Sequence, residues 1–206
     1  MAPAPKSLLQ IAGAPLTPSP LNGSVLVIID AQLEYVKGAL PLQGVDAAIR
    51  EAALLLAVAR KIAMPVFHIV QHAPAGRPLF ADDGPYAAIV PQLNPAAGEI
   101  VLRKTLPNAF AGTDLHELIQ STGRKEIIFA GFMTHMCVSA SARAALDLKY
   151  RSTVVANATA TRDLPDPLGG MIPASVVHRT ALSELADRFA IVVKDTAALL
   201  PQQTTA

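Results

Sequence analysis

Three residues with reactive or charged side chains stand where apolar runs of the sequence end. Asp30 closes one run, Lys104 follows another, and Cys137 comes a few residues after a third. A cysteine there is expected at the start of a helix, where the helix dipole predicts a lowered thiol pKa and a reactive thiolate. Together these residue types fit nucleophilic catalysis: the thiol attacks, the carboxylate takes its proton, and the ammonium keeps the carboxylate ionised.

Each residue also has a purely structural interpretation. A lone cysteine is more often a small buried apolar residue than a nucleophile. Asp30 could cap the helix that follows, and Lys104 could be a solvated loop residue. Their occurrence together at one expected edge of the fold is what favours catalysis over these alternatives.

Short runs rich in β-branched residues alternate with amphipathic stretches, a pattern typical of βα units around a parallel sheet. Strands are expected at residues 25–30, 66–71, 99–102, 125–131, 153–157 and 190–194, and helices at 45–60, 113–121, 135–149 and 175–188. In a sheet of this kind ligands bind outside the carboxyl ends of the strands. Asp30, Lys104 and Cys137 are all expected at that edge.

Proline divides the chain into regions. The first twenty residues contain five prolines and predict an extended arm, so we expect one domain over residues 21–206. Residues 73–98 contain five more prolines and predict a long irregular loop. Loops of that length usually serve a site or an interface.

Composition and net charge indicate which partners and locations this protein can have. Hydrophobic residues make up 51% of the 206 residues and charged residues only 16%, which predicts a substantial core. The net charge of +1, without a basic block, argues against nucleic acid and anionic lipid as partners. No apolar run reaches the ~20 residues of a membrane span, so we expect a soluble protein. The single cysteine and the lack of a signal-like start predict a cytoplasmic location.

Three segments carry a family resemblance: VIIDAQLEY, LRKTLPNAFAGTDL and AGFMTHMCVSASARAALDLKY. They resemble the signature segments of the isochorismatase-like cysteine hydrolases, which include nicotinamidases, N-carbamoylsarcosine amidohydrolase and isochorismatase. The resemblance covers residues 22 to 200, roughly, and implies a three-layer α/β/α fold with a six-stranded, mainly parallel, Rossmann-like sheet. It makes Asp30, Lys104 and Cys137 a catalytic triad. It also implies a cis peptide at Phe132–Met133 and an oxyanion hole formed by the N–H groups of Met133 and Cys137.

The resemblance extends to the substrate pocket and the reaction. It implies that Gln32 helps to order the site, and the candidates for contact with the substrate are Gln32, Tyr35, Phe110, Phe132 and His135. Phe80 and Tyr86 are expected to close the pocket, although aromatic residues at such places are as often plain core. Retention of the thiol favours hydrolysis of a small-molecule amide through a thioester. The alternatives are isochorismatase-type cleavage of a vinyl ether and a non-catalytic or redox-sensing thiol.

We expect no metal and no cofactor. Metal-dependent relatives hold an ion through an Asp-x-His pair, whereas this region reads Val70-Gln71-His72-Ala73. His68 and His72 are four residues apart on an expected strand, too far at ~3.3 Å per residue to share one ion. His68 is expected in the core and His72 at the pocket mouth, and Asp82 or Asp83 could reach His72 only if the proline-rich loop folded back.

Two further expectations concern binding and assembly. No G-x-G-x-x-G follows a strand, which argues against a dinucleotide-binding protein. A low charged fraction, together with an arm and a long loop, predicts a homo-oligomer.

Overall fold

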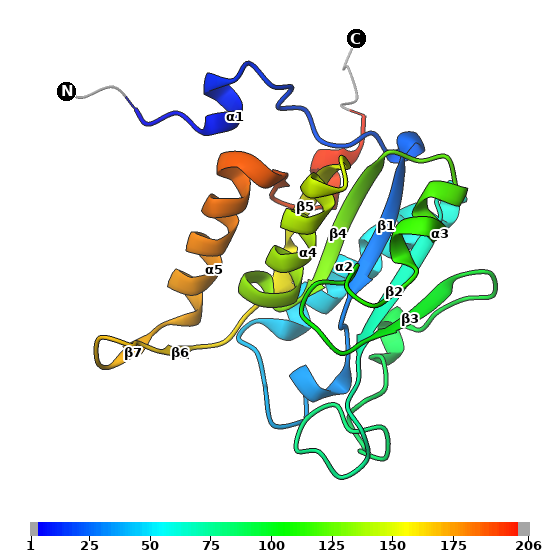
Figure 1. Ribbon diagram of the computed structural model, residues 1–206, viewed down its shortest axis with the longest axis vertical. Helices are drawn as coiled ribbons and strands as arrows, with labels where there is room; N and C mark the ends of the chain where they lie inside the picture. The colour runs from blue at the N-terminus through cyan, green and yellow to red at the C-terminus, as the bar shows by residue number, and fades with distance from the viewer. Residues whose placement is uncertain (1–3, 202–206) are drawn as a thin grey trace.

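A six-stranded parallel sheet forms the centre of the molecule in the computed structural model, which describes residues 4–201 (Figure 1). Its strands are β1 (Ser24–Ile29), β2 (Val66–Gln71), β3 (Ile100–Lys104), β4 (Glu126–Phe132), β5 (Arg151–Ala160) and β8 (Ile191–Val193). They lie in the order β3-β2-β1-β4-β5-β8, and every neighbouring pair is parallel. The predicted α/β fold with six parallel strands is confirmed.

Helices cover both faces of the sheet, which gives three layers. The helices are α1 (Leu8–Ile11), α2 (Val45–Lys61), α3 (Leu115–Ser121), α4 (Ser139–Asp147) and α5 (Ala174–Glu184). Figure 1 shows α3 and α4 on one face and α2 on the other. The chain makes this possible because the fully buried β1 alternates: Leu26 and Ile28 face the α2 side, whereas Val25 and Val27 face the α3 and α4 side.

The strand order reverses between β1 and β4. The chain runs outward from β1 to β2 and β3, and then returns to place β4 on the other side of β1. In open α/β sheets the carboxyl ends of the strands at such a reversal border the ligand-binding crevice. The topology therefore places the end of β1 and the segment after β4 at the expected site.

The proline-rich loop between β2 and β3 is tied to the segment that leaves β1. The N–H of Val90 donates to the carbonyl of Ala31, and the N–H of Leu33 donates to the carbonyl of Ala88. A short 3-10 turn, Pro91–Leu93, follows. The loop thus returns to the sheet edge above the carboxyl ends of β1 and β2, through backbone hydrogen bonds that do not depend on side-chain identity.

Two small elements flank the sheet. The N-terminal segment contains α1 and is joined to β5 by Ser19, whose N–H donates to Thr153 Oγ1 at 2.8 Å. A hairpin of β6 (Leu164–Pro165) and β7 (Met171–Ile172) projects from the body and was not predicted (Figure 1). Two-residue strands are too short to show a periodic pattern in the sequence.

Candidate active site

Asp30 leaves the sheet directly after β1. It is fully buried, and its φ of 48° lies in the left-handed region that non-glycine residues rarely adopt. Its N–H still donates to the Ile69 carbonyl of β2 at 2.8 Å. The backbone is therefore bent sharply at this residue while it stays attached to the sheet, and such strained positions cluster at functional sites.

Gly131 of β4 lies against the residue that precedes Asp30. A Cβ at Gly131 would lie 2.0 Å from the carbonyl oxygen of Ile29, and its φ is +104°. Only glycine allows the two backbones to approach this closely. The close approach brings the carboxyl ends of β1 and β4 together at the crevice.

Lys104, the last residue of β3, contacts both of the other candidate residues. Its Nζ lies 2.7 Å from Asp30 Oδ2 and 3.4 Å from Cys137 Sγ. Neither Asp30 nor Lys104 has an exposed side chain. The structure therefore brings together the three residues of the predicted triad in one buried cluster.

Cys137 lies in a π-helical turn, Thr134–Val138, that leads into α4, and only 5% of the residue is exposed. Burial raises the pKa of the Cys137 thiol to about 12; the nearby Asp30 raises it further, and Lys104 opposes both. The predicted lowering of the thiol pKa is therefore wrong. A helix end offers only about half a unit charge, which does not outweigh the loss of solvation of a buried thiolate.

Burial also raises the pKa of the Asp30 carboxyl, with the Lys104 ammonium acting in the opposite direction. The carboxylate is thus a better proton acceptor than an exposed aspartate. A neutral thiol beside such a carboxylate fits proton transfer during attack, not a preformed thiolate.

The segment between β4 and Cys137 is held from two sides. Its first peptide bond, Phe132–Met133, is cis. Thr134 Oγ1 lies 2.9 Å from His178 Nδ1 of α5, and His135 Nδ1 lies 2.6 Å from Thr161 Oγ1. Neither His178 nor Thr161 was identified from the sequence, because nothing in their own segments marks them as neighbours of the nucleophile.

The expected substrate-contact residues fall into two groups. Tyr35 packs edge-to-face against Phe80 and Phe132, with ring centroids 5.4 and 5.8 Å away, on the α2 side of the sheet. Phe110 instead stacks on Tyr150 in the core cluster of the opposite face. The structure thus unites Tyr35 and Phe132 but separates Phe110 from them.

Gln32 joins the ends of β1 and β2 to the long loop. Its Nε2 donates to the carbonyls of Gln71 and Ala87 at 2.9 and 2.7 Å, and its Oε1 accepts from the Gln71 N–H at 2.9 Å. The side chain is almost fully buried. In this position it orders the backbone around the triad.

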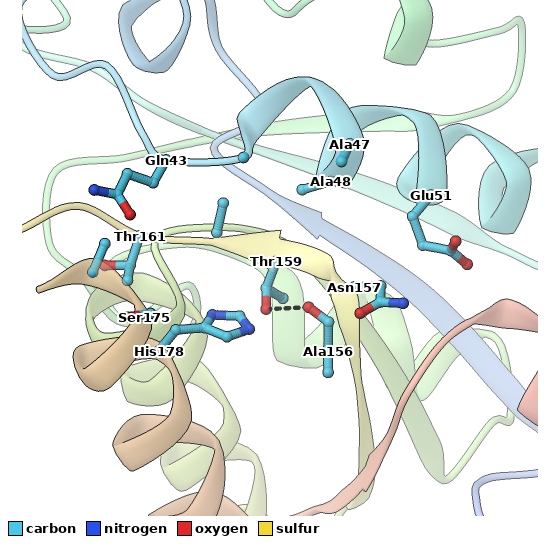
Figure 2. Close-up of a pocket in the computed structure, with 13 residues that line it drawn as sticks. Gln43, Ala47, Ala48, Glu51, Ala156, Asn157, Thr159, Thr161, Ser175 and His178 are labelled. Atoms are coloured by element: carbon cyan, nitrogen blue, oxygen red, sulfur yellow. Dashed lines mark hydrogen bonds between the residues drawn. The ribbon is translucent and has the colours of Figure 1, made fainter.

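A cavity of about 560 Å³ lies beside the nucleophile segment, between α2, β5 and α5 (Figure 2). Figure 2 shows Thr159 and His178 facing its interior, and Thr159 Oγ1 donates to the Ala156 carbonyl at 2.9 Å. Its wall residues Thr161 and His178 are the same two that contact His135 and Thr134. Asp30, Lys104 and Cys137 do not line this cavity.

The possible metal ligands are engaged elsewhere. The proline-rich loop does fold back and places Asp82 Oδ2 3.7 Å from His72 Nδ1, although the Asp82 side chain stays 44% exposed. Asp82 also forms an ion pair with the Arg103 guanidinium. This cation occupies the place that a metal ion bound to Asp82 would need. His68 is buried as expected, with Nε2 2.8 Å from Glu99 Oε2. Residues 4–201 contain no group of three or more His, Cys, Asp or Glu side chains that could hold a metal.

Two more polar residues, one that contacts Lys104 and one whose charge acts on His135, were not identified as site residues in the sequence. Gln71 Oε1 accepts a hydrogen bond from Lys104 Nζ at 2.7 Å. Arg162 follows Thr161, forms no ion pair within the described chain, and its buried Nε has no hydrogen-bond partner there. The Arg162 charge lowers the pKa of His135, after the larger effect of burial.

Comparison with known proteins agrees with the fold and the resemblance. The family model "Isochorismatase domain" matches residues 24–197. A "Secreted isochorismatase effector Isc1" of Verticillium dahliae is 36% identical over 187 residues, covering 91% of this chain and 96% of the relative. A maleamate amidohydrolase of Pseudomonas putida is 35% identical over 149 residues, covering 63% of this chain and 68% of the relative.

A solved structure of an isochorismatase from Pseudomonas putida superimposes with a TM-score of 0.91 at 41% identity, covering 96% of this chain and all of the other. The family model alone spans most of the chain and includes all three residues of the buried cluster. This chain is therefore a hydrolase that belongs to the isochorismatase family.

Proposed function

We propose that this protein hydrolyses the amide bond of a small molecule through a thioester on Cys137. The observation that carries the proposal is the buried cluster in which Lys104 Nζ lies 2.7 Å from Asp30 Oδ2 and 3.4 Å from Cys137 Sγ. A carboxylate and a thiol that share one ammonium are the parts that acyl transfer requires.

In the acylation step, Asp30 accepts the thiol proton while Sγ attacks the carbonyl carbon of the amide. The N–H groups of Met133 and Cys137 receive the negative charge that develops on the oxygen, and each such donor typically contributes a few kcal/mol. Asp30 then gives its proton to the departing nitrogen, and the C–N bond breaks to leave the thioester. Lys104 remains charged and balances Asp30 and the sulfur in turn.

In the deacylation step, Asp30 takes a proton from a water molecule that attacks the thioester carbonyl. The same two N–H groups hold the oxyanion, and the C–S bond breaks to release the acid. The thiol regains its proton from Asp30, so the cycle closes without a net change in the protein.

We propose that the preferred amides carry a carboxylate. One relative is named as an amidohydrolase of maleamate, which bears both groups. In this chain, Arg162 provides a guanidinium that no carboxylate of residues 4–201 pairs with. A guanidinium recognises a carboxylate through two parallel hydrogen bonds.

The test is a screen of small primary amides, with and without a carboxylate, with ammonia release as the readout. We expect turnover that Cys137→Ala abolishes and that alkylation of Cys137 removes in proportion to the thiol modified. Ser121→Ala, a similar truncation on the exposed side of α3, serves as the matched control and should keep full activity.

Circular dichroism and the unfolding midpoint establish that Cys137→Ala is folded. Amide turnover that survives in the folded Cys137→Ala variant would exclude the thioester route. Absence of turnover on the whole amide panel would exclude the proposed substrate class.

The cytoplasmic location also stands as a proposal. The described residues include no helix that is both long and apolar enough to cross a membrane. One relative is named as a secreted protein, so cell fractionation with an antibody against the native protein decides between the two compartments.

A further inference from the structure

Gln71 ends β2 and is the direct neighbour of Lys104 in the register between β2 and β3. Its Oε1 accepts a hydrogen bond from Lys104 Nζ at 2.7 Å, the same distance that separates Lys104 from Asp30. Because an ammonium can only donate, the oxygen of the Gln71 amide must be the atom that faces it. Gln71 therefore reaches the reactive cluster through Lys104.

Lys104 has three N–H donors and three partners around its Nζ: the Asp30 carboxylate, the Gln71 amide oxygen and the Cys137 sulfur. The contacts with Gln71 and Cys137 are hydrogen bonds and the contact with Asp30 is an ion pair, so the ammonium is held on three sides. The role of Lys104 is then electrostatic, and it depends on the third partner, Gln71, to hold the ammonium between carboxylate and sulfur.

The backbone of Gln71 is fixed as firmly as its side chain. The buried carboxamide of Gln32 both donates to the Gln71 carbonyl and accepts from the Gln71 N–H, at 2.9 Å each. This paired arrangement extends the contact between β1 and β2 beyond Asp30. It transmits the position of β1, which carries the carboxylate, to the residue that holds the ammonium.

The side chain at position 71 also sets the charge of the cluster. Asp30, Lys104 and a neutral thiol sum to zero, and they still sum to zero when the thiol proton moves to Asp30. A glutamine adds no charge, whereas a glutamate would make the same contact with Lys104 and leave a net charge of −1 in a buried site.

We propose that Gln71 is a positioning residue that holds the Lys104 ammonium between Asp30 and Cys137 and keeps the buried cluster electrically neutral. This inference rests on the proposed function for its kinetic readout. A second readout, the alkylation of Cys137 by iodoacetamide, needs no substrate.

The decisive variant is Gln71→Glu, because glutamate preserves the size of the side chain and the hydrogen bond to Lys104. Gln120→Glu is the matched control, since it makes the same chemical change on the exposed end of α3. Gln71→Ala removes the contact altogether. All assays contain a chelator, so that a new carboxylate near His72 and Asp82 cannot act by recruiting a metal.

The added negative charge disfavours both the thiolate and the ionised form of Asp30. Gln71→Glu should therefore slow alkylation at pH 9 by at least about fivefold and move the acid limb of kcat/KM about one pH unit upward. Gln71→Ala should lower kcat by about tenfold or more, with KM changed by less than about threefold. Gln120→Glu should change neither the alkylation rate nor the pH profile.

A purely structural role for Gln71 predicts that Gln71→Glu leaves alkylation and the acid limb unchanged, and that result would overturn the inference. Unfolding midpoints measured for all variants separate a folding defect from a change in charge. If no amide is turned over but alkylation responds to Gln71→Glu as expected, the placement of Gln71 stands and the proposed substrate class fails.

Discussion

Lys104 organises the site at the level of single residues. Three segments that are far apart in the sequence meet at its Nζ, and the ion pair with Asp30 has no solvent to weaken it. Removal of either charge would leave the other buried and unpaired. The same ammonium that assists chemistry is thus required to keep the carboxylate inside the fold.

The sequence predicted the position of the Cys137 thiol but not its pKa. The expected position of Cys137 near a helix start was right, but its pKa depends on burial, which the residue types around it do not reveal. Gln71 was considered only as a missing metal ligand. Its contact with Lys104 follows from the neighbouring positions of β2 and β3 in the sheet, which a linear pattern does not contain.

We expect catalysis to proceed without a bound metal. His72 and Asp82 approach each other, but the Arg103 guanidinium already pairs with Asp82 and would repel a second cation. Dialysis against a strong chelator should leave amide turnover unchanged, and mass spectrometry should find less than stoichiometric metal. Stoichiometric metal together with activity lost to the chelator would contradict this prediction and favour a nicotinamidase-like mechanism.

At the scale of elements, the contact between β1 and β4 is the most demanding feature of the backbone. Gly131→Ala should lower the free energy of unfolding by at least about 3 kcal/mol, because the new Cβ meets the Ile29 carbonyl in a backbone conformation that L-residues avoid. Chemical denaturation monitored by circular dichroism measures the loss.

Gly123→Ala is the matched control for that change. Gly123 has a φ of +71°, but a Cβ there meets nothing within 4 Å. Gly123→Ala should therefore lower the free energy of unfolding only by the cost of the backbone conformation, about 1–2 kcal/mol. Equal losses for the two variants would mean that the close approach of β1 and β4 contributes nothing to the cost.

A second element-scale feature is the contact between β2 and the start of β3 through His68 and Glu99. Burial alone would raise the pKa of Glu99, but hydrogen bonds from Arg60, the Ala96 N–H and His68 outweigh it and lower the pKa to about 2. Burial lowers the pKa of His68, so this ring is stable in its neutral form.

Both shifts make the fold less stable in acid. The Glu99 contribution is complete above its ordinary pKa of 4.5 and is lost as the pH falls toward about 2. We expect it to amount to about 1–2 kcal/mol, since Arg60 is partly exposed and solvent screens the pair. The stability difference between the natural protein and Glu99→Gln should therefore be largest above pH 5 and shrink toward pH 2. A difference independent of pH, or an equal effect of the exposed Glu117→Gln, would contradict the assignment.

The elements that the sequence predicted well are those with long periodic patterns. Residues 45–60 show helical spacing over four turns, and α2 occupies Val45–Lys61. The hairpin of β6 and β7 and the ties between residues 31–34 and 86–90 were not predicted. Their stability comes from backbone hydrogen bonds and from glycines at a turn, so the side chains carry little information about them.

At the scale of the whole molecule, two segments project from the body, the N-terminal segment with α1 and the β6–β7 hairpin (Figure 1). Both carry exposed apolar side chains. In the N-terminal segment, Leu8 and Ile11 are 50% and 68% exposed. At the tip of the β6–β7 hairpin, Leu168 is 95% exposed, and Met171 beside it is 59% exposed. Such groups are costly in water unless another surface covers them.

We therefore expect a homo-oligomer in which these projecting segments are covered by a second copy. Light scattering at micromolar concentration should give a multiple of the 21.5 kDa chain mass. Leu168→Ser and Ile11→Ser, each a polar replacement at an exposed position, should shift the distribution toward smaller species while the unfolding midpoint of the monomer stays constant. A mass of one chain for the natural protein would contradict the prediction. An exposed leucine that is buried on assembly contributes about 2 kcal/mol, which is enough to alter a micromolar equilibrium. An unchanged oligomer in both variants would therefore mean that the interface lies on another face of the protein.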